Sequence, residues 1–336
     1  MNLYLGRALQ VGLPLLVALI LSALIFAISG YDVGAVIAGV IEGAVTGQGA
    51  LAQTLRWTVP ILLIALGFMI TFRSGEFNIG AQGQLMMGGI GTAAVALLIP
   101  GPAFLVLPLA IAAGMVMGAF WSAIAGVLKL RFGTDEVIST LMLNFIAVLM
   151  VQYVTTGPLK DDAVRGDSAS TVKVADEMRL ASGAGMSWTM AALVIVAVLA
   201  AWAIAERTAF GRKSLMVGRN PLASAWQGLE VRRLRMATYL ISGAFVGLAG
   251  ALEVLGPTGR LITGATPIVG FTGIMVAVVG MVRVPGIVLA ALFFGALQAA
   301  ILFLPIVSDL PTSGLRIFEG LIGVLVTARF LTLVRR

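Results

Sequence analysis

The sequence predicts an all-α membrane protein that crosses the bilayer many times, and its composition is the reason. Of the 336 residues, 60% are hydrophobic and 11% are charged. Soluble domains carry roughly 25% charged residues, and the mean hydropathy of this chain is high, at +1.05. The composition therefore excludes a soluble enzyme and a disordered chain.

Two missing residue types remove whole classes of chemistry. The sequence contains neither cysteine nor histidine. It has no thiolate or imidazole ligands for zinc, haem or iron–sulfur clusters, no Ser-His-Asp triad and no disulfide. We expect no catalytic residue, no metal site and no resident cofactor in this chain.

The hydrophobic pattern predicts about ten transmembrane helices, since each crossing needs roughly 20 apolar residues. The predicted spans are 9–28, 57–72, 79–99, 103–127, 137–156, 187–205, 236–255, 267–282, 284–305 and 316–334. The apolar run of the first span is too long for a typical signal peptide. We therefore expect an uncleaved helix, with cleavage after the small residues at 27–29 as the alternative.

The segment 33–53 is predicted to be an external or half-inserted helix. Counting it as a span would reverse the side of every later loop. Gly39, Gly43 and Gly47 follow one another at four-residue intervals, a spacing that allows close packing against another helix. The alternative is a merely flexible stretch. The pairs Gly114–Gly118 and Gly243–Gly247 have the same spacing and predict helix packing.

Most of the 22 lysines and arginines fall on one side of the predicted spans when both termini are cytoplasmic. This is the asymmetry of the positive-inside rule, and it accounts for the pI of about 10.4, so we expect no nucleic-acid partner. It places the polar loop 157–187 outside the cell, where it contacts a soluble partner or only connects two helices. The basic loop 206–235 lies inside.

The loop 206–235 contains a predicted short helix. Asn220 can cap its first turn, Pro221 suits the first helical position and Gly228 ends it. A helix of two turns is not stable alone, so it must rest on the membrane or on another protein. Its basic residues flank the helix instead of lying within it, which favours a cytoplasmic protein partner.

Polar residues gather between two predicted spans, at 71–84. Irregular backbone at membrane depth occurs where it is buried in protein or lines water. We interpret the segment as a broken helix along a pathway, with an ordinary turn capped by Asn78 as the alternative.

A second glycine-rich segment, 264–280, is predicted to enter from the opposite side, which suggests an inverted repeat. Asn144, Gln152 and Gln298 face a polar cavity or make interhelical hydrogen bonds.

The sequence shows no energy source for transport within this chain. It lacks the Gly-x-x-x-x-Gly-Lys-Ser/Thr phosphate loop, and a proton-coupled carrier needs titratable groups deep in the bundle. Glu253 and Glu319 lie near predicted helix ends, and we expect Glu319 to pair with Arg316, one turn away. The sequence thus favours a pore subunit moved by a separate ATPase over an ion-coupled carrier that acts alone.

Four motifs resemble the permeases of ABC importers of the branched-chain amino acid and simple-sugar type, specifically the nucleoside branch. The segment 75–84 reads Gly-Glu-Phe-Asn-Ile-Gly-Ala-Gln-Gly-Gln, where sugar permeases carry an Asp-Leu-Ser version. The other motifs are 134–144, 217–225 with Gly228, and 270–277 with Pro285 and Gly286. The resemblance covers residues 55 to 330. Gln82 stands where the nucleoside branch often has glutamate.

The resemblance implies a single transmembrane permease domain, 1–336, in the inner membrane of a bacterium. It implies three partners: an ABC ATPase that binds ATP and magnesium, a second permease of different sequence, and an external substrate-binding lipoprotein. The transported molecule would be a nucleoside or related purine compound, with a simple sugar as the alternative.

The site residues follow from the same motifs. We expect the translocation path to use Glu76, Phe77, Asn78, Gln82, Gln84 and Asn144. Asparagine can hydrogen-bond a ribose or a base edge, and phenylalanine can stack on a base. The resemblance makes the segment 218–228 the coupling helix that meets the ATPase, through Gly218, Arg219, Asn220, Pro221, Ala223, Ala225, Trp226 and Gly228.

Overall fold

The computed structural model of the chain describes residues 16–163, 169–181, 186–264, 269–307, 316–317 and 319–325. These residues are mainly helical, and no β-strand occurs among them. Two isolated antiparallel bridges, Lys160 with Thr171 and Ser170 with Ile262, are the β-type pairings in this part of the chain. The predicted all-α class is confirmed.

Seven helices of the described chain are long and apolar enough to cross a membrane. They are α3 (Ala50–Arg73), α4 (Ala81–Leu98), α5 (Ala103–Phe132), α6 (Glu136–Thr156), α7 (Trp188–Trp202) with its π-helical continuation η3 (Ala203–Arg207), α10 (Val231–Leu255) and α12 (Val284–Val307). Each matches one of the ten predicted spans. A polytopic helical membrane protein is therefore confirmed.

The other three predicted spans are shorter or partly outside the described residues. The first is described only from residue 16, as the helix Leu16–Ile28, and the last lies outside the described residues beyond position 325. Of the span 267–282, residues 269–282 are described, and their helical part is α11 (Val269–Val279). It ends where Met281 and Val282 adopt φ angles of 55°, a left-handed conformation that a helix cannot continue through.

Helices extend past the apolar runs that predicted them. α3 begins at Ala50 instead of 57, α5 continues to Phe132 and α10 begins at Val231 instead of 236. Polar and basic side chains at these ends lower the hydropathy without interrupting the backbone hydrogen bonds. The segment 206–235, predicted as a loop, is accordingly largely helical, with α8 (Ala209–Arg219) and α9 (Pro221–Trp226) inside it.

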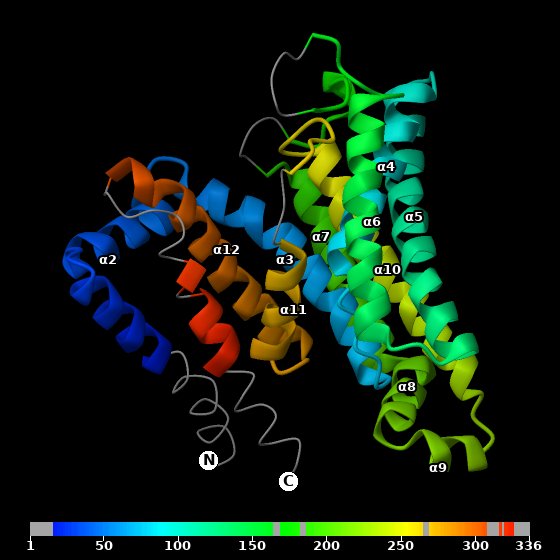
Figure 1. The fold of residues 1–336 in the computed structure, drawn as a ribbon. Coiled ribbons are helices and arrows are strands. Elements are labelled where there is room, and N and C mark those ends of the chain that lie inside the picture. Colours follow the sequence, from blue (N-terminus) through cyan, green and yellow to red (C-terminus); the bar gives the residue numbers. More distant parts are fainter. Residues whose placement is uncertain are drawn as a thin grey trace. The chain divides into compact units, whose positions relative to one another are not determined.

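The chain divides into two compact units, 59–274 and 1–58 with 275–336. In the unit 59–274, helices α4, α5, α6 and α10 pack side by side (Figure 1). α8 and α9 lie at one end of this bundle, and the segment that follows α6 lies at the opposite end. The two long loops predicted on opposite sides of the membrane are thus at opposite ends of the bundle.

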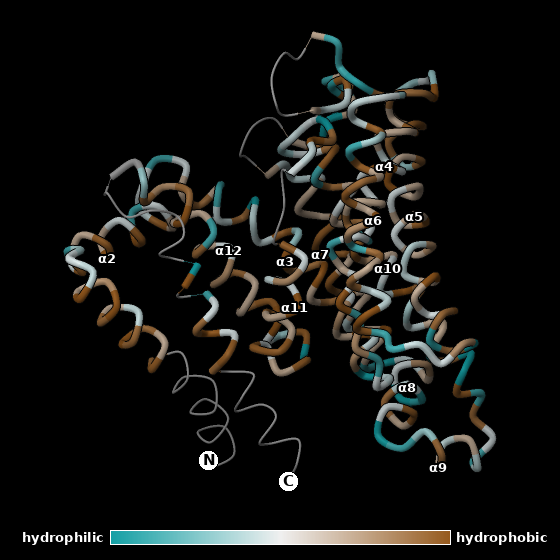
Figure 2. The backbone as a smooth tube through the Cα atoms, in the orientation of Figure 1, coloured by the Kyte–Doolittle hydropathy of each residue, from teal (hydrophilic) through white to brown (hydrophobic). Residues whose placement is uncertain are grey.

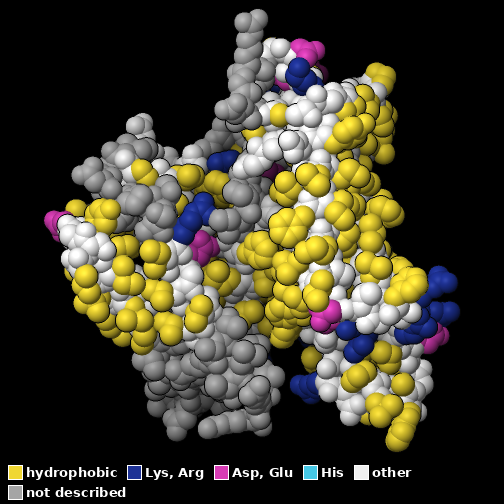
Figure 3. Space-filling model, viewed as in Figure 1, with side chains coloured by type: hydrophobic (Ala, Val, Ile, Leu, Met, Phe, Trp, Pro, Cys, Tyr) yellow, Lys and Arg dark blue, Asp and Glu magenta, His cyan; other side chains and the backbone are white. Residues whose placement is uncertain are grey.

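Hydropathy follows the same division. The spans are coloured mainly as hydrophobic, whereas hydrophilic residues gather around α8 and in the segment after α6 (Figure 2). On the face shown in Figure 3, hydrophobic side chains cover the helices and Lys and Arg gather at the α8–α9 end.

Glycines set the closest crossings in the bundle. A Cβ added to Gly118 of α5 would overlap the carbonyl oxygen of Gly243 and lie 2.6 Å from the Cα of Gly247, both in α10. A Cβ on Gly247 would in turn overlap the carbonyl oxygen of Gly114. The two predicted glycine pairs therefore pack against each other, as expected for helices that associate through close backbone contact in lipid.

The spans of this unit differ in how deeply they are buried. In the most hydrophobic window of each helix, 72% of α4 and 78% of α10 are buried, against 22% of α5 and 28% of α6. α4 and α10 therefore form the interior of the bundle, and α5 and α6 present apolar side chains outward.

The unit 1–58 with 275–336 combines the N-terminal helices with α12. Asp32 caps α2 (Val33–Ile41), which continues into the π-helix η1 (Glu42–Thr46). A Cβ on Gly43 would lie 2.7 Å from the side chain of Phe303 in α12, so the predicted packing role is confirmed for this glycine. Gln298 donates to the Glu319 carboxylate at 3.2 Å, an interhelical hydrogen bond.

The glycine crossing of α5 and α10 predicts the effect of added volume. Gly118→Val is expected to lower the free energy of unfolding by about 1–3 kcal/mol, because the new side chain meets backbone that cannot move aside. The check is the thermal unfolding midpoint of the detergent-solubilised protein. The matched control is Ala112→Val, at an exposed position of the same helix. Equal midpoints for the two variants would contradict the packing role.

Candidate functional site

The candidate site is the turn 74–80 between α3 and α4, with the first turn of α4. Gly75 has a φ of +83°, which a residue with a side chain rarely adopts, so the glycine allows α3 to end here. Alternate residues of the turn are nevertheless buried, while Gly75 and Phe77 are exposed. Glu76 and Asn78 are 1% and 2% exposed, and Gln84 in α4 is 1% exposed.

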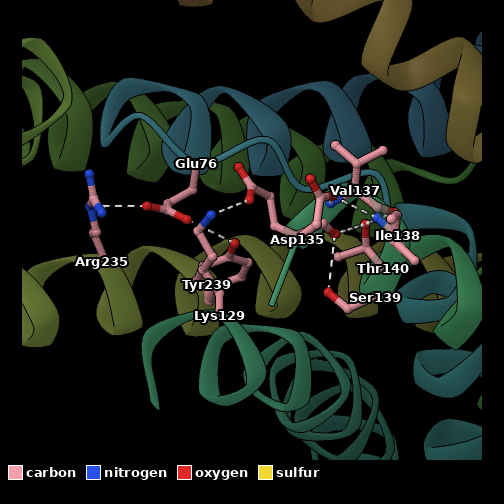
Figure 4. A network of polar contacts seen from close by, with 10 residues as sticks. Glu76, Lys129, Asp135, Val137, Ile138, Ser139, Thr140, Arg235 and Tyr239 are labelled. Carbon is pink, nitrogen blue, oxygen red and sulfur yellow. Dashed lines mark hydrogen bonds and ion pairs between the residues drawn. The ribbon is translucent and has the colours of Figure 1, made fainter. Parts of the chain in front are cut away.

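Glu76 is held by two side chains of α10 (Figure 4). The Nε of Arg235 lies 3.0 Å from Oε1, in an orientation that gives an ion pair without an aligned hydrogen bond. The Tyr239 hydroxyl donates to Oε2 at 3.1 Å. Burial raises the pKa of the Glu76 carboxyl, while the Arg235 charge and the Tyr239 hydrogen bond act against that rise.

Four polar side chains on one face of α10 contact the turn. Besides Arg235 and Tyr239, Thr238 makes a 2.9 Å hydrogen bond with the Ser74 hydroxyl, and Ser242 lies 3.5 Å from the Asn78 amide nitrogen. Positions 235, 238, 239 and 242 share one helix face because they are three and four residues apart. One face of α10 therefore contacts Ser74, Glu76 and Asn78 of the turn.

Asn78 is the centre of the polar contacts in the turn. Its Oδ1 accepts hydrogen bonds from the Gly80 backbone N–H and from Gln84 Nε2, both at 3.0 Å. Its Nδ2 lies 3.5 Å from the hydroxyl of Ser122 in α5. Both interpretations from the sequence describe part of this arrangement: Asn78 stabilises the turn, and the turn is a buried break between two spans.

Asn144 connects α6 to the same turn. Its Oδ1 accepts from the Gly83 N–H at 2.8 Å, and its Nδ2 donates to the Ile79 carbonyl at 3.1 Å. This is the interhelical hydrogen bond expected as one of two alternatives. Two backbone groups at the start of α4 thus depend on a single side chain.

Gln82 brings the second glycine-rich segment to the site. Its Oε1 accepts from the Gly270 N–H at 2.8 Å. A Cβ on Gly270 would lie 2.6 Å from the Gln82 backbone nitrogen, so α11 and α4 touch through backbone at this point. The two segments singled out in the sequence, 71–84 and 264–280, therefore meet at Gln82 and Gly270.

Phe77 is the outward-facing member of an aromatic cluster. Its ring lies 5.3 Å from that of Phe68 and 6.2 Å from that of Phe72, both edge-on. Phe68 is fully buried, whereas Phe77 is 36% exposed. An exposed aromatic face beside buried amides suits a ligand that combines a flat ring with hydrogen-bonding edges.

The polar network is incompletely paired in this conformation. Gln84 Oε1 and Trp121 Nε1 are buried, and neither has a hydrogen-bond partner among the described residues. An unpaired buried polar group costs about 1–3 kcal/mol. Trp121 Nε1 would lie 2.9 Å from a Cβ on Gly83, so both atoms border the start of α4.

A second ion pair closes the end of the bundle next to the turn. Lys129 of α5 lies 2.6 Å from the carboxylate of Glu136 in α6. Asp135 caps α6 by accepting from the backbone of Val137 at 2.8 Å (Figure 4). Among the described residues, no three acidic side chains come together in a way that could hold a metal ion.

The short helix predicted at 220–228 is confirmed as α9. The Asn220 side chain caps it by accepting from Ala223 N–H at 3.0 Å, Pro221 occupies the first turn and Gly228 follows with a φ of +78°. Its residues Leu222 and Trp226 are 64% and 84% exposed. α9 therefore presents an apolar surface at the end of the bundle.

Six predicted path residues are assembled at or beside one turn, although the sequence spreads them over 69 positions from Glu76 to Asn144. Their role in transport remains a prediction. Sequence reasoning missed the partners on α10, namely Thr238, Tyr239 and Ser242, and counted Arg235 only as a loop charge. The three- and four-residue spacing of these polar residues at the start of a span was the available signal.

The Asn144 bridge gives a stability prediction. Asn144→Ala is expected to lower the free energy of unfolding by about 1–3 kcal/mol, since it leaves the Gly83 N–H and the Ile79 carbonyl unpaired in the interior. The measurement is thermal unfolding in detergent. Gln152→Ala, at an exposed position of the same helix, is the matched control. A loss no larger than that of the control would show that the bridge contributes nothing.

Comparison with known proteins agrees with this architecture. Residues 50–328 match the model of the family described as branched-chain amino acid transport system, permease component. The guanosine ABC transporter permease NupP of Bacillus subtilis is 35% identical over 95% of this chain and 92% of its own length. The glucose permease TsgB13 of Haloferax volcanii is 30% identical over 85% of this chain and 78% of its own length. The nucleoside permease NupB of Lactococcus lactis is 31% identical over 74% and 71%. The chain therefore belongs to the family of permease components of branched-chain amino acid type ABC transport systems.

Proposed function

We propose that this chain is the transmembrane permease subunit of an ABC importer for purine nucleosides. The observation that carries the proposal is the 35% identity to a guanosine permease over nearly the whole chain. The 31% identity to a second nucleoside permease supports it. The glucose permease at 30% identity makes a simple-sugar importer the second candidate.

The chemistry of the turn 74–80 suits a nucleoside. Phe77 offers an exposed ring for stacking on a purine. The amides of Asn78, Gln82 and Gln84 are buried and hydrogen-bonded to the protein here, so they would meet base edges or ribose hydroxyls in a second arrangement of the turn. Asn144 holds the start of α4 in place. Glu76 contributes to the site indirectly, because its ion pair with Arg235 holds the turn against α10.

The energy for transport would come from ATP hydrolysed by a partner protein. We infer an ABC ATPase that binds ATP and magnesium and docks on α9, a second permease and an external substrate-binding lipoprotein, in the inner membrane of a bacterium. The exposed apolar side chains of α9 and the basic residues near it support docking of a protein at this end. Both chain termini would then be cytoplasmic, together with α8 and α9.

Uptake by the reconstituted transporter tests the substrate. Proteoliposomes that contain this chain with its ATPase, second permease and binding protein are expected to accumulate radiolabelled guanosine or adenosine only with ATP. Unlabelled nucleosides should compete and glucose should not. Phe77→Ala should raise the half-saturating concentration about tenfold, since base stacking is worth ~1–3 kcal/mol.

Phe104→Ala is the control for Phe77, because Phe104 is 81% exposed on the outer face of α5. Competition by glucose instead of nucleosides would favour the sugar importer. Uptake by this chain alone, driven by a proton or sodium gradient without an ATPase, would replace the ABC proposal by a secondary carrier.

Docking of the ATPase on α9 is tested with two exposed tryptophans. Trp226→Ala is expected to weaken association with the ATPase by about 2 kcal/mol or more, the usual effect of removing a central aromatic contact. Trp188→Ala, which removes a side chain 91% exposed at the start of α7, should leave it unchanged. The measurement is the affinity of the detergent-solubilised permease for the ATPase. Equal affinities for both variants would mean that α9 is only a connector.

A further inference from the structure

The end of α8 touches the turn 74–80 through backbone alone. A Cβ on Gly218 would overlap the carbonyl oxygen of Arg73 and lie 2.9 Å from the Gly75 nitrogen. A Cβ on Gly75 would lie 3.2 Å from the Gly218 Cα. No side chain separates the two segments, so a shift of α8 cannot be absorbed there by a rotamer change.

α8 and α9 are joined without a flexible residue. The Asn220 N–H donates to the Met216 carbonyl and closes α8 at 3.0 Å, while the Asn220 side chain caps α9. The Ser224 hydroxyl donates to the Asn220 carbonyl at 2.8 Å. A displacement of α9 therefore moves Gly218 with it.

The residue after Gly75 carries the contact on to α10. The Glu76 carboxylate is bound by Arg235 and Tyr239, and the neighbouring Ser74 is bound by Thr238. Arg235 lies in the first two turns of α10, which begins five residues after α9 ends. The turn is thus held from two sides by elements adjacent to α9.

We propose that the Gly75–Gly218 contact and the Glu76–Arg235 ion pair form the joint through which movement of α8 and α9 reaches the turn 74–80 and its side chain Asn78. The proposal rests on the proposed function, because it requires an ATPase that moves α9. The unpaired atoms Gln84 Oε1 and Trp121 Nε1 support it, since a second arrangement of the turn can pair what this one leaves unpaired.

The test measures uptake per ATP hydrolysed by the complete transporter in proteoliposomes. Gly218→Ala is expected to reduce uptake per ATP hydrolysed at least tenfold relative to the unchanged protein. A packing defect alone would lower the amount of folded transporter and leave the ratio unchanged.

Gly114→Ala is the matched packing control. A Cβ on Gly114 would overlap the Thr92 hydroxyl and lie 2.9 Å from Ala251. Gly114 is far from the turn, because it lies about 22 Å along α5 from Lys129, which is next to the turn, at 1.5 Å per residue. This variant should lower the unfolding midpoint and keep the ratio. An unchanged ratio in Gly218→Ala, or the same behaviour in both variants, would overturn the joint.

The ion pair is tested by exchanging its charges. Glu76→Gln and Arg235→Gln are each expected to reduce uptake per ATP at least tenfold, and the double exchange Glu76→Arg with Arg235→Glu should restore it to within threefold. A double-exchange variant that assembles but still has low uptake per ATP would show that the ion pair has no role in the joint. If these variants do not assemble, Gly218→Ala decides the proposal.

Failure of the joint and failure of the proposed function are distinguishable. Absence of ATP-driven nucleoside uptake by the unchanged chain would refute the function. Normal coupling in the variants of an active transporter would refute the joint.

Discussion

Polar groups that are buried in the break between two membrane-spanning helices must find their hydrogen-bond partners within the protein. The rest of this structure depends on how that requirement is met at the turn between α3 and α4. One face of α10 supplies Arg235, Thr238, Tyr239 and Ser242, and α6 supplies Asn144. Glycines in α4, α5 and α10 bring these helices close enough for short side chains to reach the turn.

The buried carboxylate sets the strictest demand. An unpaired charge in a low-dielectric interior is far more costly than a paired one, so Glu76 and Arg235 must be ordered together. Charge pairing also ties α5 to α6 through Lys129 and Glu136 next to the turn. The charges of the candidate site are thus held by ion pairs, while two of its neutral groups, the Gln84 carbonyl and the Trp121 N–H, are buried without a hydrogen-bond partner among the described residues.

Local rules were sufficient wherever one segment decides its own structure. Hydropathy located seven of the spans, cap chemistry located α9 with Asn220 at its start, and the glycine spacing found the α5–α10 crossing. Arg235 shows where such rules stop. Its charge suggested a loop, whereas it lies in a helix opposite a carboxylate 159 positions earlier in the sequence, and only the packing of α10 on the turn brings them together.

Pairings of this kind are invisible to local patterns because each partner also has an ordinary local explanation. Gln82 could be an amide on any helix, and Gly270 any flexible residue, yet they meet at 2.8 Å. Helix ends were missed for a related reason: hydropathy falls at the membrane boundary before the helix ends, as in the basic start of α10.

The unequal burial of the spans has a consequence for how this chain can vary between organisms. The outward faces of α5 and α6 need only be compatible with hydrocarbon, so Leu, Ile, Val and Phe are interchangeable there at little cost. α4 and α10 allow no such drift, since a single methyl group at Gly88 or Gly250 would enter a neighbouring backbone. Sequence divergence should therefore concentrate on the surface facing the lipid and leave the inner pair of helices nearly constant in volume.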